Sequence, residues 1–146
     1  MRQPRRLHRR NGAALVEMAL VLPVFLTVVL GIMEFGRAMM VSNLVANAAR
    51  EGARLSVTTG STNSSVTTAV QSFMTSAIGV SSGNVTVTIT VTAAAGNPDP
   101  GNDVAIARRS DVCTVHVTVP FNAVCLVTAD YLAGVDLVGH CAMRHE

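Results

Sequence analysis

An apolar run near the N-terminus constrains this chain more than any other feature. The 21 residues of Ala13–Met33 read AALVEMALVLPVFLTVVLGIM and include one charged residue. As an α-helix they would span about 30 Å, the thickness of the hydrocarbon core of a bilayer. We therefore predict a transmembrane helix over residues 13–36, which argues against a freely soluble protein.

A cluster of arginines precedes this run and predicts its orientation. All 11 basic residues of the chain are arginine, and five of them lie in the first ten positions: Arg2, Arg5, Arg6, Arg9 and Arg10. Positive charge beside a transmembrane helix stays in the cytoplasm, so the C-terminal body should lie outside it. Without residues 1–12 the net charge changes from +2 to −3. A nucleic-acid-binding protein would instead carry positive charge over a folded face, so no nucleic-acid partner is predicted.

Two residues are unusual inside the run. Glu17 places a carboxylate in lipid, at a cost of about 2.5–3.5 kcal/mol at the bilayer centre and less near an end. Either it snorkels or is protonated near the cytoplasmic boundary, or it has a partner inside the membrane. Pro23 removes a backbone donor in mid-helix, which predicts a kink or a local loosening.

The junction between the basic head and the run resembles the processing site of type IV prepilins. Gly12 is followed by AALVE, so that Glu17 is the fifth residue after the glycine. The resemblance implies that a prepilin peptidase cuts between Gly12 and Ala13 and removes the leader 1–12. In that family the new amine is thought to pair with the glutamate of a neighbouring subunit, which here would make Glu17 the residue that sets subunit register.

The competing interpretation of the head is an ordinary secretory signal peptide. Such peptides have an apolar region of about 7–15 residues, closely followed by a small-x-small cleavage site. The run here is longer, and the nearest candidate, Ala46–Ala48, lies well beyond its end. The length and the distance both favour a retained anchor.

The whole stretch Gly12–Leu55 resembles the TadE-like proteins, which are minor pilin-like components of the tight-adherence (Flp) pilus machinery. The resemblance rests on Glu34, Gly36 and the AAREGAR box, residues 48–54, and it returns in Ala142–Glu146. It implies an α+β fold in which a long N-terminal helix precedes a small antiparallel-sheet domain. It also implies the bacterial inner membrane as location, pilus association, and other pilin-like subunits and an assembly platform as partners.

Residues 37–57 are predicted to continue the helix outside the membrane, because no proline intervenes and helix-forming residues dominate. Four polar residues spaced by three or four positions share one face. This stripe is either a solvated surface or a contact with another subunit or with the C-terminal domain. Glu34 and Arg37 are expected to pair locally at an exposed site. The residues expected to take part in helix packing are Pro23, Glu34, Asn43, Asn47, Arg50 and Arg54.

Residues 58–146 are predicted to form the extracytoplasmic α+β domain. A cap at Ser64 or Ser65 should start a second helix that runs to about Ile78. Alternating valine and threonine predict strands over 84–92 and 113–119 that pair as a hairpin across a long loop. Residues 137–143 are expected to form a third, shorter strand.

Residues that could carry chemistry are few. Of the three cysteines, Cys125 and Cys141 are the preferred disulfide pair, because Cys113 has the pattern of a buried strand residue. The spacing of His116, His140 and His145 matches no standard metal site. The sequence has no phosphate-binding loop and no nucleophile elbow. We therefore expect no enzyme activity, no metal and no cofactor.

These observations predict a non-catalytic, pilin-like membrane protein that takes part in assembling a tight-adherence pilus or a related secretion apparatus. The alternative is a single-pass, membrane-anchored envelope protein that binds an extracytoplasmic ligand and never joins a filament. Neighbouring genes for a secretion ATPase and a prepilin peptidase would favour the pilus.

Overall fold

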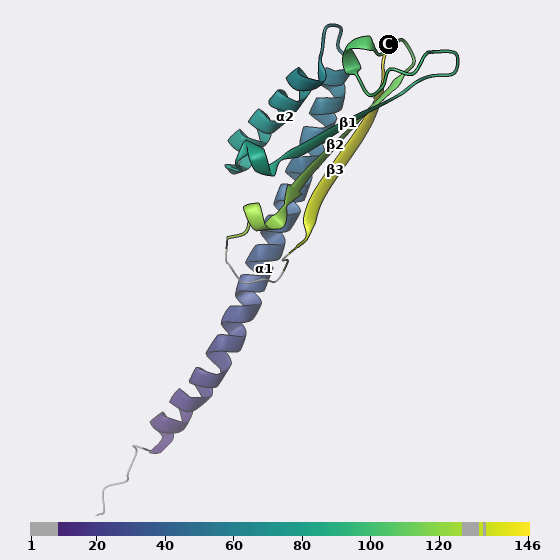
Figure 1. Ribbon diagram of the computed structural model, residues 1–146. Coiled ribbons are helices and arrows are strands. Elements are labelled where there is room, and N and C mark those ends of the chain that lie inside the picture. Colours follow the sequence, from purple (N-terminus) through teal and green to yellow (C-terminus); the bar gives the residue numbers. More distant parts are fainter. Residues whose placement is uncertain (1–8, 127–131, 133) are drawn as a thin grey trace, which may run out of the picture.

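One long helix carries a small domain on its C-terminal half. The computed structural model describes residues 9–126, 132 and 134–146, and the side chains from residue 12 onward. Helix α1, Arg9–Ser56, has 48 residues and is continuous through the predicted span and its extension. Figure 1 shows its N-terminal half projecting from the domain. Most of the predicted leader, residues 1–8, lies outside the described residues.

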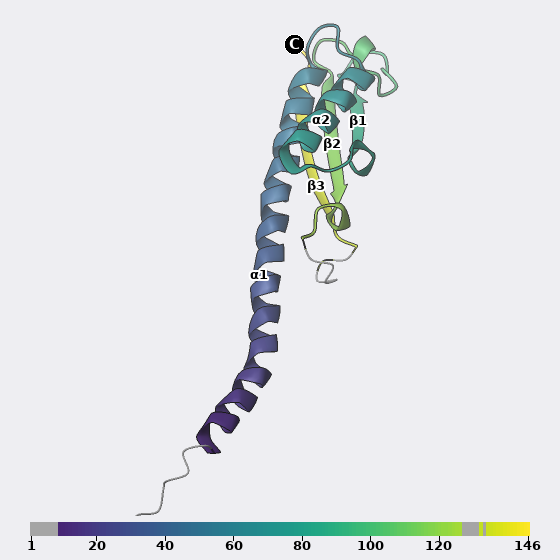
Figure 2. The same ribbon diagram turned by 90° about the vertical axis from the view of Figure 1, so that its left-hand side faces the viewer.

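Helix α1 passes through Pro23 without a break. The hydroxyl of Thr27 donates a hydrogen bond of 2.8 Å to the Pro23 carbonyl. Proline and such back-bonding hydroxyls both bend helices. Figure 2 shows α1 curving in its N-terminal half, so Pro23 bends this helix and does not end it.

Helix α2, Asn63–Ile78, follows a short turn and packs beside α1. Its N-cap is Thr62, whose hydroxyl accepts from the Ser65 amide while the Ser65 hydroxyl accepts from the Thr62 amide. The predicted cap at Ser64 or Ser65 is therefore wrong by two or three positions, because Ser65 is the reciprocal partner of a capping box. Gly79 ends the helix in the left-handed conformation, with φ of 72°.

In the described part of the chain, three strands form one antiparallel sheet in the order β1-β2-β3. The strands are β1, Thr86–Thr92, β2, Val112–Pro120, and β3, Asp136–Arg144. The alternation of valine and threonine holds, since Val115, Val117 and Val119 of β2 are buried and the threonines of β1 are exposed. The third strand is as long as β2, so the expectation of a shorter one is wrong. Short 3-10 turns are Ser82–Asn84, Val104–Ile106 and Phe121–Ala123.

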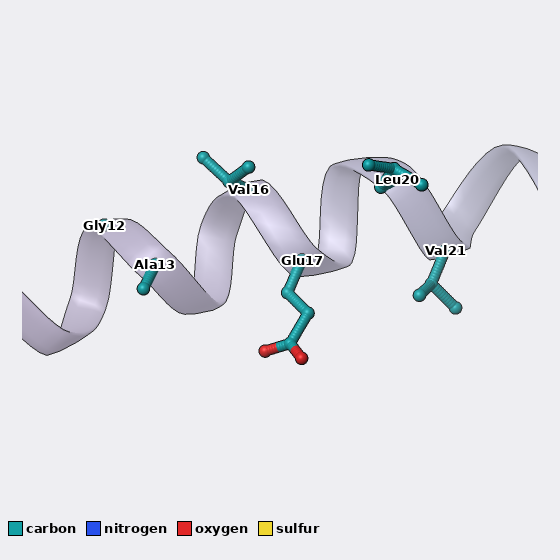
Figure 3. A pocket seen from close by; sticks show the side chains of 6 residues that line it. All are labelled: Gly12, Ala13, Val16, Glu17, Leu20 and Val21. Atoms are coloured by element: carbon teal, nitrogen blue, oxygen red, sulfur yellow. The ribbon is translucent and has the colours of Figure 1, made fainter.

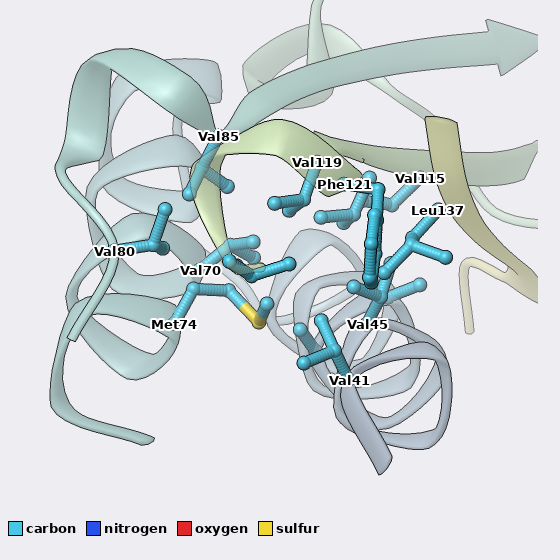
Figure 4. Close-up of a cluster of buried hydrophobic side chains, with 14 of the residues drawn as sticks. Val41, Val45, Val70, Met74, Val80, Val85, Val115, Val119, Phe121 and Leu137 are labelled. Carbon is cyan, nitrogen blue, oxygen red and sulfur yellow. The ribbon is translucent and has the colours of Figure 1, made fainter. Parts of the chain in front are cut away.

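The core lies between the two helices and one face of the sheet. Figure 4 shows Val41 and Val45 of α1, Met74 of α2, and Val115 and Val119 of β2 pointing into the same apolar cluster. Both helices cover this face, and no described element covers the other face of the sheet (Figure 1). The molecule is a two-layer α+β fold, as the sequence predicts.

A glycine allows β3 to lie unusually close to α1. A Cβ atom placed on Gly139 would be 2.8 Å from the backbone of Val45 and of Ala46. Glycine within a strand often marks such a close approach of another backbone. The contact fixes the sheet at a short distance from the helix.

The loop between β1 and β2 is organised by one buried carboxylate. Asp111 accepts hydrogen bonds from the Ala94 amide at 2.8 Å, the Asn97 side chain at 2.7 Å and the Arg108 amide at 2.7 Å. These bonds, the one from Asn97 foremost, lower the pKa of Asp111. The predicted long loop is therefore an ordered one, folded around a charge at its base.

Candidate assembly and anchoring surface

The N-terminal part of α1 presents an acidic group on an apolar rod. Ala13, Glu17 and Val21 lie on the same side of the helix, one turn apart, and Val16 and Leu20 lie on the other (Figure 3). Together with Gly12 these residues line a shallow groove along the helix. Glu17 is exposed, so its carboxylate is available to a partner that approaches this side.

The predicted cleavage junction lies within the helix. Gly12 and Ala13 both belong to α1, which begins three residues earlier at Arg9. Glu17 follows Ala13 by four residues, or about 6 Å of helix rise. An amine created at Ala13 would therefore lie one turn from the carboxylate on the same subunit.

The side chains of this half of α1 are apolar and uncovered. Every side chain from Gly12 to Val28 is exposed, including Phe25 and Leu26. Among the described residues, one helix is long and apolar enough to cross a membrane, and it is this one. An apolar surface of this extent is rare in water-soluble monomers and marks contact with lipid or protein.

At the point where α1 meets the domain, two charged side chains bind the loop that follows β2. Glu34 is 1% exposed, and its Oε1 accepts a hydrogen bond of 3.0 Å from the Leu126 amide. The Arg37 guanidinium donates to the Val124 carbonyl. The expectation of an exposed local pair is therefore wrong: the site is buried, and the contacts described reach 92 and 87 residues along the chain.

The polar stripe of α1 is exposed to solvent on the side away from the core. It comprises Asn43, Asn47, Arg50 and Arg54. Arg50 donates to the Asn47 side chain at 3.0 Å, and Arg54 forms an ion pair of 2.5 Å with Glu51. The hydrogen bond between them lowers the pKa of Glu51 and raises that of Arg54. Within the described ranges the side-chain hydrogen bonds of the stripe stay within α1, so the stripe can face solvent or another subunit.

Comparison with protein families finds a match for the segment that forms helix α1. The family model described as "TadE-like protein" matches residues 12–54. Over this segment the chain is similar to the TadE-like proteins. No curated protein and no solved structure matches the chain.

The TadE-like segment coincides with α1 from Gly12 almost to its end at Ser56. It contains Glu17, Pro23, Glu34 and the polar stripe, whereas α2 and the sheet lie outside it. The similarity indicates a pilus-related membrane component, and the apolar helix is long enough to serve as a membrane anchor. The family match does not extend to the sheet domain, which is known from the structure alone.

The open face of the sheet is polar and largely uncharged. Thr86, Thr88, Thr90 and Thr92 of β1 are exposed on it. His116 of β2 and His140 of β3 stand opposite each other, with ring centroids 5.6 Å apart. Within the described ranges there is no cluster of three or more residues suited to a metal ion.

The three cysteines are free thiols in the structure. Cys141 pairs with Val115 in the sheet. It lies five residues from Asp136, where the pairing of β2 and β3 ends, and five strand residues span about 17 Å. Cys125 follows the opposite strand beyond that end and bonds back to Phe121. A disulfide requires Cα atoms within about 7 Å, so the predicted Cys125–Cys141 bond is absent. Burial raises the pKa of the Cys113 thiol, which disfavours its reaction.

Three important residues were not singled out from the sequence. Leu126 donates its backbone amide to a residue 92 positions away, and the Asp111 carboxylate accepts from Ala94 and Asn97, 17 and 14 positions away, so no local pattern reveals these contacts. Gly139 did leave a signal, because it interrupts the apolar, inward-facing positions of its strand.

Proposed function

We propose that this protein is a non-catalytic, pilin-like subunit that takes part in assembling a tight-adherence pilus or a related secretion apparatus. It would be a single-pass protein of the bacterial inner membrane, with its N-terminus in the cytoplasm and the sheet domain outside. The observation that carries the proposal is the exposed carboxylate of Glu17, which lies one turn from Ala13 on the apolar, TadE-like helix.

The physical argument is one of charge in lipid. A lone carboxylate within the span is unfavourable, and so is a lone amine. Two such groups offset each other only when they approach closely and in good geometry. A neighbouring subunit that brings the amine of its Ala13 to Glu17 would satisfy both, and only one axial register allows this. The proposed role of Glu17 is therefore to select the register of assembly.

Replacing Glu17 tests this role. In Glu17→Ala we expect the amount of protein in the membrane to be unchanged or higher, because a costly charge is gone, while its recovery with pili or with other pilin-like subunits falls severalfold. Leu22→Ala is the matched control, since Leu22 is an exposed apolar residue of the same helix that does not line the groove with Glu17. It should assemble as the unmodified chain does.

Normal incorporation of Glu17→Ala into pili or pilus complexes would remove Glu17 from this role. Should neither the unmodified chain nor any variant be recovered with a pilus complex, the result would favour an anchored envelope protein whose open threonine face binds an extracytoplasmic ligand.

A further inference from the structure

The described start of the loop that follows β2, Phe121–Leu126, lies at the level of the outer end of the proposed span. The proposed span ends at residue 36, so Glu34 is two residues, about 3 Å, from its outer end. Leu126 bonds to Glu34 through its amide at 3.0 Å. Figure 1 and Figure 2 both show this end of the domain pointing along α1 toward its N-terminal half.

The contacts between α1 and this loop bury one charged side chain and partly bury a second. The carboxylate of Glu34 is buried beneath the loop, and the half-buried guanidinium of Arg37 donates to the Val124 carbonyl. The described part of the loop, Phe121–Leu126, contains no charged residue. These contacts hold both ionic groups under or against the loop, and Asp136, beside Val135, is an exposed acidic residue at the same end of the domain.

Apolar side chains remain exposed at the same level. Leu126 is 60% exposed, and Phe35, the neighbour of Glu34 on α1, is 62% exposed. Val135, whose carbonyl accepts from the Phe121 amide where the chain returns to β3, is 42% exposed. These three side chains continue the uncovered apolar surface of the span onto the domain.

We propose that Leu126, Phe35 and Val135 form a lipid-contact surface that rests in the headgroup layer of the outer leaflet. Glu34 and Arg37 hold the loop in place for this contact. The inference depends on the proposed membrane anchor, because the height of the loop is measured from the end of the span. Its consequence is that the sheet domain has a preferred orientation on the membrane.

A fluorescence experiment on the full chain tests the surface. The protein is reconstituted in vesicles of phosphatidylethanolamine and phosphatidylglycerol, and an environment-sensitive dye is attached to single cysteines. Cys125 and Cys141 are replaced by serine, and Cys113, which is 0% exposed, stays in place. The dye is placed at Leu126→Cys, at Phe25→Cys within the span, and at Ile106→Cys. Ile106 is 59% exposed but lies in the loop between β1 and β2, so it is the matched control for Leu126.

We expect lipids with a nitroxide near the headgroup to quench the Leu126 dye severalfold more than the Ile106 dye, and aqueous iodide to show the reverse order. Equal quenching at Leu126 and Ile106, with the Phe25 dye quenched by lipid, would overturn the lipid contact and leave the anchor intact. Protection of Leu126 from both quenchers would also overturn it, since protein would then cover the site. A Phe25 dye that is not quenched by lipids with the nitroxide near the end of the acyl chain would instead refute the anchor itself. Circular dichroism of each labelled variant confirms that the fold is retained.

Discussion

Gly139 controls how closely the sheet packs on α1. The Cβ of Gly139→Ala would stand 2.8 Å from backbone atoms of Val45 and Ala46, which cannot turn away as a side chain would. Overpacking of this kind costs about 1–3 kcal/mol. We expect a lower midpoint of thermal unfolding, measured by circular dichroism of the full chain in detergent.

Gly83→Ala is the control for this substitution, because the nearest atom to its new Cβ, the hydroxyl of Ser81, is 4.0 Å away. Equal stability of the two variants would show that β3 can shift along α1 without loss. That result would contradict the tight packing inferred at Gly139.

Asp111 makes the loop between β1 and β2 sensitive to acid. Its pKa is lowered in the folded chain, chiefly by the hydrogen bond from Asn97. A lowered carboxyl pKa contributes stability above the unfolded pKa, and that contribution is lost as pH falls through the folded value. We expect the free energy of unfolding to decrease as the pH drops below about 4. Urea titration at several pH values measures this decrease.

Asp111→Asn removes the titrating group and should flatten this pH dependence, while lowering stability at neutral pH because one acceptor oxygen becomes a donor. Asp99→Asn, in the same loop, is a comparison that leaves the Asp111 network in place. An unchanged acid slope in Asp111→Asn would place the sensitivity in another group.

At the scale of elements, substitutions in the exposed stripe of α1 distinguish effects on folding from effects on assembly. Asn43 and Asn47 are exposed, so Asn43→Ala and Asn47→Ala should change the free energy of unfolding by less than about 0.5 kcal/mol. If the stripe contacts a neighbouring subunit, the double variant should be recovered less often with pilus complexes. Chemical denaturation and co-purification measure the two effects separately, and Thr88→Ala on the open sheet face serves as the exposed control.

Unaltered co-purification of the double variant would assign the stripe to solvent. A loss of stability would contradict its exposed position in the single chain.

The elements themselves were predictable where a short repeat governs them. The valine–threonine alternation of β1 and β2 and the apolar spacing of α2 follow local periodicity, which a single sequence displays. The cap of α2 was misplaced because Thr62, Ser64 and Ser65 are all suitable capping residues, and the reciprocal bond decides between them. The burial of Glu34 escaped prediction because its contact lies 92 residues away.

At the scale of the whole molecule, removal of the leader, residues 1–12, determines where the mature protein begins. The full chain has a mass of 15.3 kDa. In cells with an active prepilin peptidase, we expect the mass of membrane-extracted protein to match a chain that begins at Ala13. In cells without the peptidase, the mass should be that of the full chain. Because Gly12 and Ala13 lie inside α1, cleavage requires that the first turns of the helix open.

An intact leader in assembled protein would contradict the prepilin resemblance, and it would leave Glu17 without the amine of Ala13 as a partner. The TadE-like match over residues 12–54 would still hold.

The single helix that runs through both the span and the domain acts as a lever. Val41, Val45, Ala49 and Ala53 are buried against the sheet, so the domain cannot turn independently of α1. About 27 Å of helix separates Ala38 from Ser56. A tilt of about 20° in the bilayer, common for transmembrane helices, would carry the far end of the domain sideways by about 9 Å. A displacement of the distal loops is therefore passed along α1 toward Glu17, because one continuous helix joins the domain to the apolar end.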